Sequence, residues 1–246
     1  MADNQQPLIS HLIELRDRLL RGILAVLIIA ACLLPFANDL YHFLAEPLLV
    51  HLPETSTMIA TEVASPFLIP FKLTLSLAIL LAVPVLLYQL WAFVAPGLYD
   101  NERKLVLPLL IASTVLFFLG ILFAYYVVFP LVFGFLTQAA PEGVAVMTDI
   151  SSYLDFVLKL FFAFGLAFEV PIATLLLIWT GVSTVESLAE KRPYIIVGAF
   201  VIGMLLTPPD VISQTLLAVP VWLLFELGLI CSRWLPNKPE RSQKDD

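Results

Sequence analysis

The sequence contains few charged residues. Asp, Glu, Lys and Arg make up 13% of its 246 residues, whereas 60% are hydrophobic. A soluble domain of this size needs about a quarter of its residues charged to cover its surface. The composition therefore excludes an ordinary soluble protein. The hydrophobic residues also come in long blocks rather than in alternation, which predicts an all-α polytopic membrane protein.

Cysteine and histidine are scarce as well, and this excludes several kinds of site. The two cysteines, Cys32 and Cys231, have no CxxC partner and no Cys/His cluster, so we expect no metal and no cofactor. The three histidines lie outside the hydrophobic blocks, which excludes a serine–histidine hydrolase within the membrane. A phosphate-binding GxxxxGK[ST] loop is missing from the sequence, which argues against an ATP-driven pump. We therefore expect no enzyme, and nothing indicates nucleic-acid binding.

Six hydrophobic blocks predict six transmembrane helices. Their expected ranges are 20–36, 73–94, 105–129, 157–178, 194–206 and 211–230. Because proline bends a helix, several of these helices should be kinked. The fifth block offers about 13 residues, or roughly 20 Å, against a hydrocarbon core of about 30 Å. We expect the short fifth and sixth spans to thin the bilayer or to bind a partner. A re-entrant hairpin that does not cross is the alternative.

Lys and Arg residues predict the orientation of the chain. Arg16, Arg18 and Arg21 precede the first block, and further basic residues lie in the tail at 233–246. Loops and tails rich in Lys and Arg remain in the cytoplasm, so both termini should be cytoplasmic. Leucines recur at helical spacing in residues 7–20, which predicts an amphipathic helix on the inner membrane surface. Residues 1–246 should thus form a single integral membrane domain with a polar cytosolic tail.

Two acidic residues have both a structural and a functional interpretation. Glu169 lies near the middle of the fourth block, where a charged acid costs about 3 kcal/mol on insertion scales. Either it is a protonated side chain that hydrogen-bonds to a neighbouring helix, or it serves a proton relay or a partner contact. Glu14 lies on the amphipathic helix. It either pairs with Arg18 at i,i+4, which stabilises a helix by a few tenths of a kcal/mol, or faces a ligand.

Five segments in order resemble the TatC family of twin-arginine protein translocases, in its Gram-negative bacterial type. They cover essentially the whole chain, and one local departure is Asp17, where some members carry a basic residue. The segments are HLIELRDRL at His11–Leu19, STMIATEVASPF at Ser56–Phe67, YQLWAFVAPGLYDNERK at Tyr88–Lys104, AFGLAFEVP at Ala163–Pro171 and the stretch Lys191–Pro220.

The resemblance implies the receptor protein of a twin-arginine translocase. Such a receptor binds signal peptides with consecutive arginines on the cytosolic face. It nucleates assembly with TatB and TatA, associates with further copies of itself, and moves folded proteins across the cytoplasmic (inner) membrane of bacteria, driven by the proton motive force. The resemblance places signal-peptide binding at Glu14, Glu102 and Phe93. A guanidinium presents a rigid fork that matches a carboxylate, which a lysine cannot copy.

The resemblance also implies roles for five further residues. Glu169 would contact partner helices within the membrane, and Met204 and Thr207 would dock TatB or TatA. Pro47 would rigidify a long outer loop, and Asp210 would cap the sixth helix. The alternative function is a proton-coupled small-molecule secondary transporter, because transporters often combine discontinuous helices with an acidic residue at membrane depth.

Overall fold

The computed structural model describes residues 6–50, 58–94, 106–138, 147–206 and 211–233. These residues are helical apart from short connections, and their β structure is limited to one isolated bridge between Ile59 and Asp149. The helices are α1 (Gln6–Leu33), a 3₁₀ turn (Leu34–Phe36), α2 (Ala37–Leu49), α3 (Ser65–Val94), α5 (Val106–Phe123), a π turn (Ala124–Val128), α6 (Phe129–Gln138), α7 (Ile150–Ala167), α8 (Val170–Trp179), α9 (Val185–Glu190), α10 (Arg192–Leu206) and α11 (Val211–Arg233).

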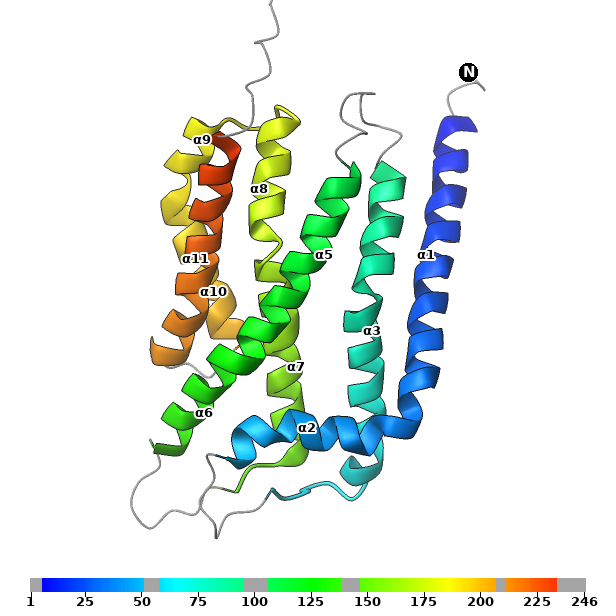
Figure 1. The fold of residues 1–246 in the computed structure, drawn as a ribbon, viewed down its shortest axis with the longest axis vertical. Helices are drawn as coiled ribbons and strands as arrows, with labels where there is room; N and C mark the ends of the chain where they lie inside the picture. Colours follow the sequence, from blue (N-terminus) through cyan, green and yellow to red (C-terminus); the bar gives the residue numbers. More distant parts are fainter. Residues whose placement is uncertain (1–5, 51–57, 95–105, 139–146, 207–210, 234–246) are drawn as a thin grey trace, which may run out of the picture.

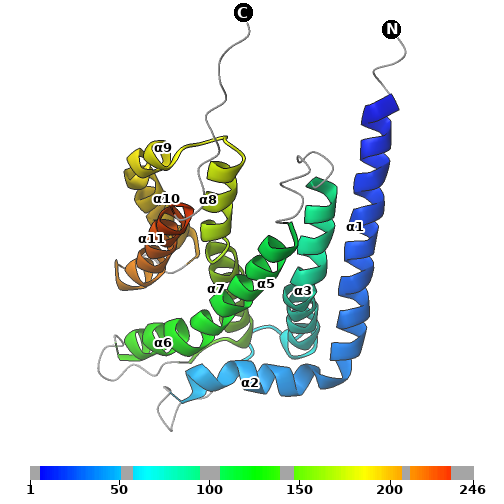
Figure 2. The ribbon, with the colours of Figure 1, turned by 45° about the horizontal axis from the view of Figure 1, so that its top comes forward.

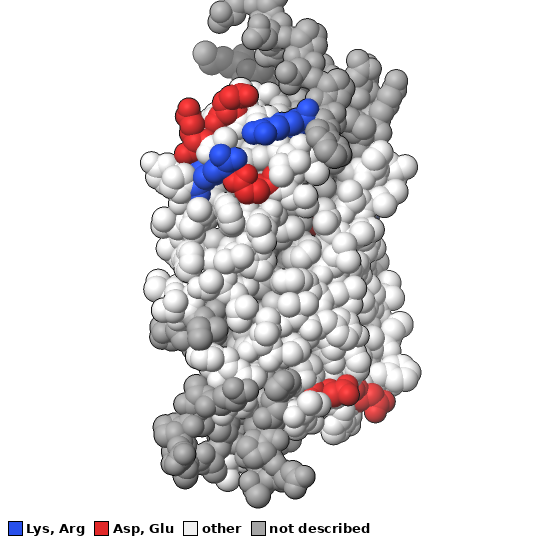
Figure 3. Space-filling model, turned by 60° about the vertical axis from the view of Figure 1, so that its left-hand side comes forward, with Lys and Arg blue, Asp and Glu red and all other residues white. Residues whose placement is uncertain are grey.

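Five helical stretches of the described residues are long and apolar enough to cross a membrane. A shorter apolar helix, Arg192–Leu205, belongs to α10. The face shown in Figure 3 carries charged side chains at its two ends and an almost uncharged band between them. The expectation of a multi-pass helical membrane protein is therefore confirmed. The five stretches are Leu12–Leu49, Ser65–Phe93, Val106–Thr137, Ile150–Trp179 and Gln214–Arg233.

The first predicted span differs from the structure at both of its ends. The amphipathic segment and the span form one helix, α1, without a break near residue 20. The chain turns at Pro35, and α2 then runs across one end of the other helices (Figure 1). Pro47 therefore lies inside a helix rather than in a long outer loop. The helix forms because Leu44, Ala45 and Leu48 are buried against the core.

The third predicted span is one long helical stretch with a π turn in its middle. α5, the π turn and α6 follow one another without a gap and cross the other helices obliquely (Figure 1). The π turn ends two residues before Pro130. A proline has no N–H to donate to the α ladder, so this helix departs from regular α geometry both at the π turn and at Pro130.

The fourth predicted span consists of two helices. α7 begins at Ile150, seven residues earlier than expected, because Asp149 caps its first turn. The helix stops after Ala167, and α8 begins at Val170 with Pro171 in its first turn. Glu169 lies in this break, as the N-cap residue of α8.

The hydrophobic core lies between α2, α3, α7 and the α5–α6 helix. Its fully buried side chains include Leu73, Phe129, Leu154 and Phe164. α5 and α7 cross closely, since a Cβ at Gly120 would lie only 2.9 Å from the carbonyl carbon of Phe164. α1 lies beside α3 at one side of this core, and α10 and α11 lie at the other side in both views (Figures 1 and 2).

Candidate functional site

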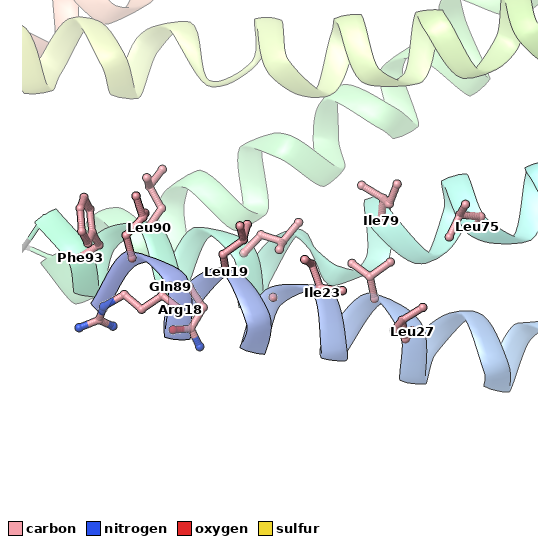
Figure 4. Close-up of a pocket in the computed structure, with 13 residues that line it drawn as sticks. Arg18, Leu19, Ile23, Leu27, Leu75, Ile79, Gln89, Leu90 and Phe93 are labelled. Carbon is pink, nitrogen blue, oxygen red and sulfur yellow. The ribbon is translucent and has the colours of Figure 1, made fainter. Parts of the chain in front are cut away.

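A groove between α1 and α3 runs along one side of the molecule. Its volume is about 470 Å³. The two helices approach closely because position 22 is a glycine, where a Cβ would lie 2.9 Å from Leu86 Cδ2. Arg18, Gln89 and Phe93 lie at one end of the groove, and apolar side chains such as Ile23 and Leu27 continue along it (Figure 4). The groove is therefore apolar along its length and polar at the end where α1 begins and α3 ends.

Glu14 is adjacent to the polar end of this groove, where Arg18 binds it. The Arg18 Nε and Nη2 atoms both donate to Glu14 Oε1, and the Nε–Oε1 distance is 2.9 Å. The Glu14 side chain is 38% exposed and that of Arg18 only 20%. Arg16, which lies nearby on α1, donates instead to Asp17 at 2.8 Å. Glu14 thus already holds a guanidinium, and its own carboxylate remains partly open to solvent.

Gln89 is a polar residue of the groove that sequence reasoning missed. Its Oε1 atom is buried and has no hydrogen-bond partner among the described residues. The only indication of this site in the sequence is that Gln89 is a single amide side chain within the apolar sequence of α3. Phe93, predicted from the resemblance, lies one turn further along α3 on the same groove. Glu102, the second predicted carboxylate, lies outside the described residues.

Glu169 contacts α5 from the break between α7 and α8. Ser113, which is 2% exposed, donates its hydroxyl hydrogen bond to Glu169 Oε2. The other carboxyl oxygen, Oε1, is buried and has no partner among the described residues. The bond from Ser113 thus ties the break between α7 and α8 to α5. A hydrogen bond from Glu169 to a neighbouring helix was one of the two interpretations that the sequence left open.

The α10–α11 pair carries an ion pair that the sequence analysis did not foresee. Arg192 Nη2 donates to Glu226 Oε2 at 2.9 Å, and thus links the start of α10 to the last two turns of α11. Only four residues separate α10 from α11, so the two helices must run antiparallel, and this could have indicated that Arg192 and Glu226 lie at the same end. Met204, near the other end of α10, is 53% exposed. Thr207 and Asp210, which follow it, lie outside the described residues.

At the opposite end from Glu14, Asp149 joins α7 to the segment before α3. Its Oδ1 atom accepts hydrogen bonds from the backbone N–H groups of Ser151 and Ser152, and Oδ2 accepts from the N–H and hydroxyl groups of Thr61. These bonds to the ionised form, first that of Ser152 and then those of Thr61, hold the pKa of Asp149 well below its ordinary value of 3.8. Tyr153 of α7 and Tyr125 of the π turn donate to backbone carbonyls of α2 at 2.7 and 2.9 Å.

These helices, with a polar-ended groove on one side and a short pair on the other, define a multi-pass α-helical membrane protein. A family model described as Sec-independent protein translocase protein (TatC) matches residues 10–220. The chain belongs to the TatC family, and its members are components of a protein translocase rather than of an enzyme family.

Relatives of known sequence and structure agree with this assignment. The TatC proteins of Haemophilus influenzae and Escherichia coli K12 are each 60% identical to this chain, over 98% and 96% of its length and 94% and 92% of theirs. A crystal structure described as the twin arginine translocase receptor TatC is 42% identical, with a TM-score of 0.80 over 91% of this chain and 98% of that one. A second, in the detergent DDM, has a TM-score of 0.82.

Proposed function

We propose that this protein is the signal-peptide receptor of a twin-arginine translocase in the bacterial cytoplasmic membrane. Its function would be to bind twin-arginine signal peptides on the cytosolic face and to nucleate assembly with TatB and TatA. The description of its crystallised relatives as twin arginine translocase receptors supports this proposal.

The contact between Glu14 and Arg18 is the observation that carries the proposal. In this contact the Glu14 carboxylate accepts a guanidinium at the polar end of the α1–α3 groove. A signal arginine can replace Arg18 on this carboxylate without a change in the chemistry of the pair. The second signal arginine would bind Glu102, and the ring of Phe93 would lie beside the peptide. Lysine would bind less well, because its ammonium lacks the planar fork.

The proposal includes six membrane crossings, with both termini in the cytoplasm. The beginning of α1 and the end of α11 lie at the same end of the molecule (Figure 1), as an even number of crossings requires. α10 would be the fifth crossing although its 15 residues extend only about 22 Å. Energy would come from the proton motive force.

The partner contacts of the proposal lie on the short pair and on Glu169. TatB or TatA would dock on α10 at Met204 and Thr207, where the exposed Met204 side chain offers apolar surface. Glu169, whose side chain is half-buried at the break between α7 and α8, would contact a partner helix there. Pro47 would stiffen α2, and Asp210 would cap α11. Copies of the protein would also associate with one another.

Site-specific photocrosslinking of a signal peptide to the protein in membranes tests the receptor function. The experiment compares an Arg-Arg signal with its Lys-Lys version on the wild type, on Glu14→Gln and on Glu102→Gln. We expect crosslinks only with the Arg-Arg signal. Glu102→Gln should lose roughly tenfold or more, since a hydrogen bond to a charged group contributes about 1.5–3 kcal/mol. Glu14→Gln should lose less, because an incoming arginine has to displace Arg18 from Glu14 in the wild type. Immunoblotting of the membrane fraction verifies insertion.

Crosslinking that is indifferent to the arginines and to both carboxylates would contradict the proposed site. The alternative, a proton-coupled small-molecule transporter, has one observation in its favour, namely the acidic Glu169 at the break of a discontinuous helix. Solute uptake by the protein alone in vesicles would favour that alternative. Dependence of transport on TatA, TatB and a folded cargo would favour the translocase.

A further inference from the structure

Lys159 of α7 is an exposed cation on a membrane-spanning stretch of the chain. It lies nine residues after the first residue of α7, or about 14 Å along the helix. Its side chain is exposed, and the ion pairs found among the described residues do not include it. An ammonium at such a depth is costly unless an anion or water meets it. The carboxylate one turn before it on α7, that of Asp155, is paired with Lys72, so one carboxylate serves two ammonium groups and Lys159 is left without an ion pair among the described residues.

The groove beside Lys159 is the second observation. It has a volume of about 730 Å³ and lies between α3, α7, α8, α10 and α11. Lys72 of α3 and Asp155 of α7 form an ion pair on its wall, and the side chain of Lys72 remains 49% exposed. The rest of the wall is mainly apolar, with Phe162 and Leu166 of α7 on one side and Ile202 and Leu217 on the other. Two ammonium groups and one carboxylate thus give one end of an apolar groove a net positive charge.

The helices α10 and α11 are short at the end of the molecule where α2 lies, and this explains why an anion can reach Lys159. At the end of the molecule where α2 lies, this pair stops short of the level reached by α2 and α6 (Figure 1). Ile202 and Leu217, near the ends of α10 and α11 at this side, line the same groove as Lys159. Lipids beside so short a pair must bring their headgroups deeper to avoid exposing hydrocarbon to water.

We propose that this groove binds a phospholipid from the leaflet on the α2 side of the membrane. Its phosphate group lies between Lys159 and Lys72, and an acyl chain follows Phe162, Leu166 and Leu217 between α7 and the α10–α11 pair. A phosphate is the anion that the bilayer itself supplies at this level, and its charge balances the net positive charge of the cluster. The proposal goes beyond signal recognition and does not depend on it.

A photoreactive residue at position 162 tests the site in the full-length protein. The protein is reconstituted in vesicles of phosphatidylethanolamine and phosphatidylglycerol, irradiated, and analysed for lipid adducts by mass spectrometry. We expect a phospholipid adduct in the wild type. Its yield should fall about fivefold in Lys159→Gln, because one basic residue near a lipid surface contributes about 1 kcal/mol to lipid binding. Lys159→Arg, which keeps the charge, should retain the adduct.

Two controls separate this site from general lipid contact. Lys191→Gln removes the same charge from an exposed position at the other end of the molecule and should leave the adduct unchanged. A photoreactive residue at Val115, exposed on α5 and outside the groove, should give adducts that are independent of Lys159.

Three results would overturn the proposal. The first is an adduct at position 162 that is equal in wild type and Lys159→Gln, with both proteins unfolding at the same temperature. The second is an undiminished adduct in vesicles of a phosphate-free glycolipid. The third is a crosslink to a protein instead of a lipid in membranes that also contain TatA and TatB, which would assign the groove to a partner helix.

Discussion

The carboxylate of Glu14 illustrates how a single residue can be both structural and functional. Its pair with Arg18 is the i,i+4 contact expected from the sequence, and the structure contains it. The same contact makes Arg18 an internal competitor of any guanidinium that binds from outside. In the proposed function, a signal peptide therefore exchanges one ion pair for another, and the gain in binding comes from its second arginine and its contacts with the groove.

Removal of Arg18 should strengthen signal-peptide binding. In Arg18→Gln the Glu14 carboxylate has lost its internal partner, so an incoming arginine no longer has to displace one. A partly exposed i,i+4 pair contributes less than about 1 kcal/mol, which limits the expected gain in affinity to about two- to fivefold. Fluorescence anisotropy of a labelled Arg-Arg signal peptide on the purified protein measures this change.

Arg16→Gln is the matched control for that experiment. It removes the same charge from the same helix, but Arg16 contacts Asp17 and not Glu14. Its affinity for the signal peptide should not rise. Equal effects of the two variants would mean that the net charge of the helix, rather than the Glu14 contact, determines binding.

Asp149 should make stability dependent on pH in the acidic range. Its pKa is lowered in the folded protein, so the ionised form stabilises the fold above the ordinary value of 3.8, and this contribution is lost as the pH falls below it. At pH 7, Asp149→Ala should lower the unfolding midpoint by about 2–4 °C, as loss of a helix cap does in a chain of this size.

Thermal unfolding of wild type and Asp149→Asn between pH 6 and pH 3 checks the sign of this dependence. Asparagine retains a capping oxygen without the charge, so the wild type should be the more stable protein at pH 6. The difference should shrink below about pH 4, as the ionised form of Asp149 stops contributing stability relative to the unfolded chain. A difference that grows as the pH falls would be inconsistent with a lowered pKa.

At the scale of elements, hydrophobic blocks predicted most helices but not how they are joined. The blocks near α3, α5, α10 and α11 appear as helices. Segments of such apolar composition avoid water, and a helix satisfies their backbone hydrogen bonds within the membrane. α2 was missed because its 13 residues mix buried leucines with Asp39, His42 and Glu46, so that no apolar run results. The break at Glu169 and the bonds from Ser113 and Thr61 depend on contacts between distant segments, which a single sequence does not display.

The crossing of α5 and α7 should not tolerate a side chain at position 120. Gly120→Ala would place a methyl group against the backbone of Phe164, and a backbone atom cannot move aside as a flexible side chain can. We expect a loss of about 1–3 kcal/mol, typical of overpacking, measured as a lowered unfolding midpoint of the purified protein.

Gly198→Ala provides the comparison within α10. A Cβ at this position meets no atom within 4 Å, and alanine favours a helix interior over glycine by about 0.5–1 kcal/mol. This variant should be as stable as the wild type or slightly more so. Equal destabilisation by both substitutions would indicate that helix flexibility, not close packing, is what the glycines provide.

At the scale of the whole molecule, the two ends of the helices differ in chemistry. Glu14, Arg18 and the Arg192–Glu226 pair lie toward one end, and Asp149 with the tyrosines that hold α2 lies toward the other. The basic residues of the sequence predicted two different ends, and the family resemblance placed Glu14 and Phe93 in one site. Sequence reasoning did not identify the apolar groove that joins them, because a groove is a property of two packed helices.

The proposed orientation can be tested with a thiol reagent that does not cross membranes. On a background with Cys32 and Cys231 replaced by alanine, cysteine is introduced at Val63 or at Val182, which are fully exposed and 74% exposed. In intact spheroplasts, Val63→Cys should react and Val182→Cys should not, because the latter would face the cytoplasm. Val182→Cys should react only after the membrane is opened, and the reverse pattern would invert the topology.

The π turn at Ala124–Val128 holds one residue more than a regular α turn does. A π turn closes its hydrogen bond over five residues instead of four, so deletion of one residue there could restore a regular α-helix and leave α6 facing as it does now. A deletion within α5 has no extra residue to remove, and each residue turns the helix by about 100°. Phe129, Val132 and Phe133, which now lie in the core, would then face other surroundings. The π turn is therefore the place in this helix where loss of one residue should disturb the packing least, although the hydropathy of the two deletions is almost the same.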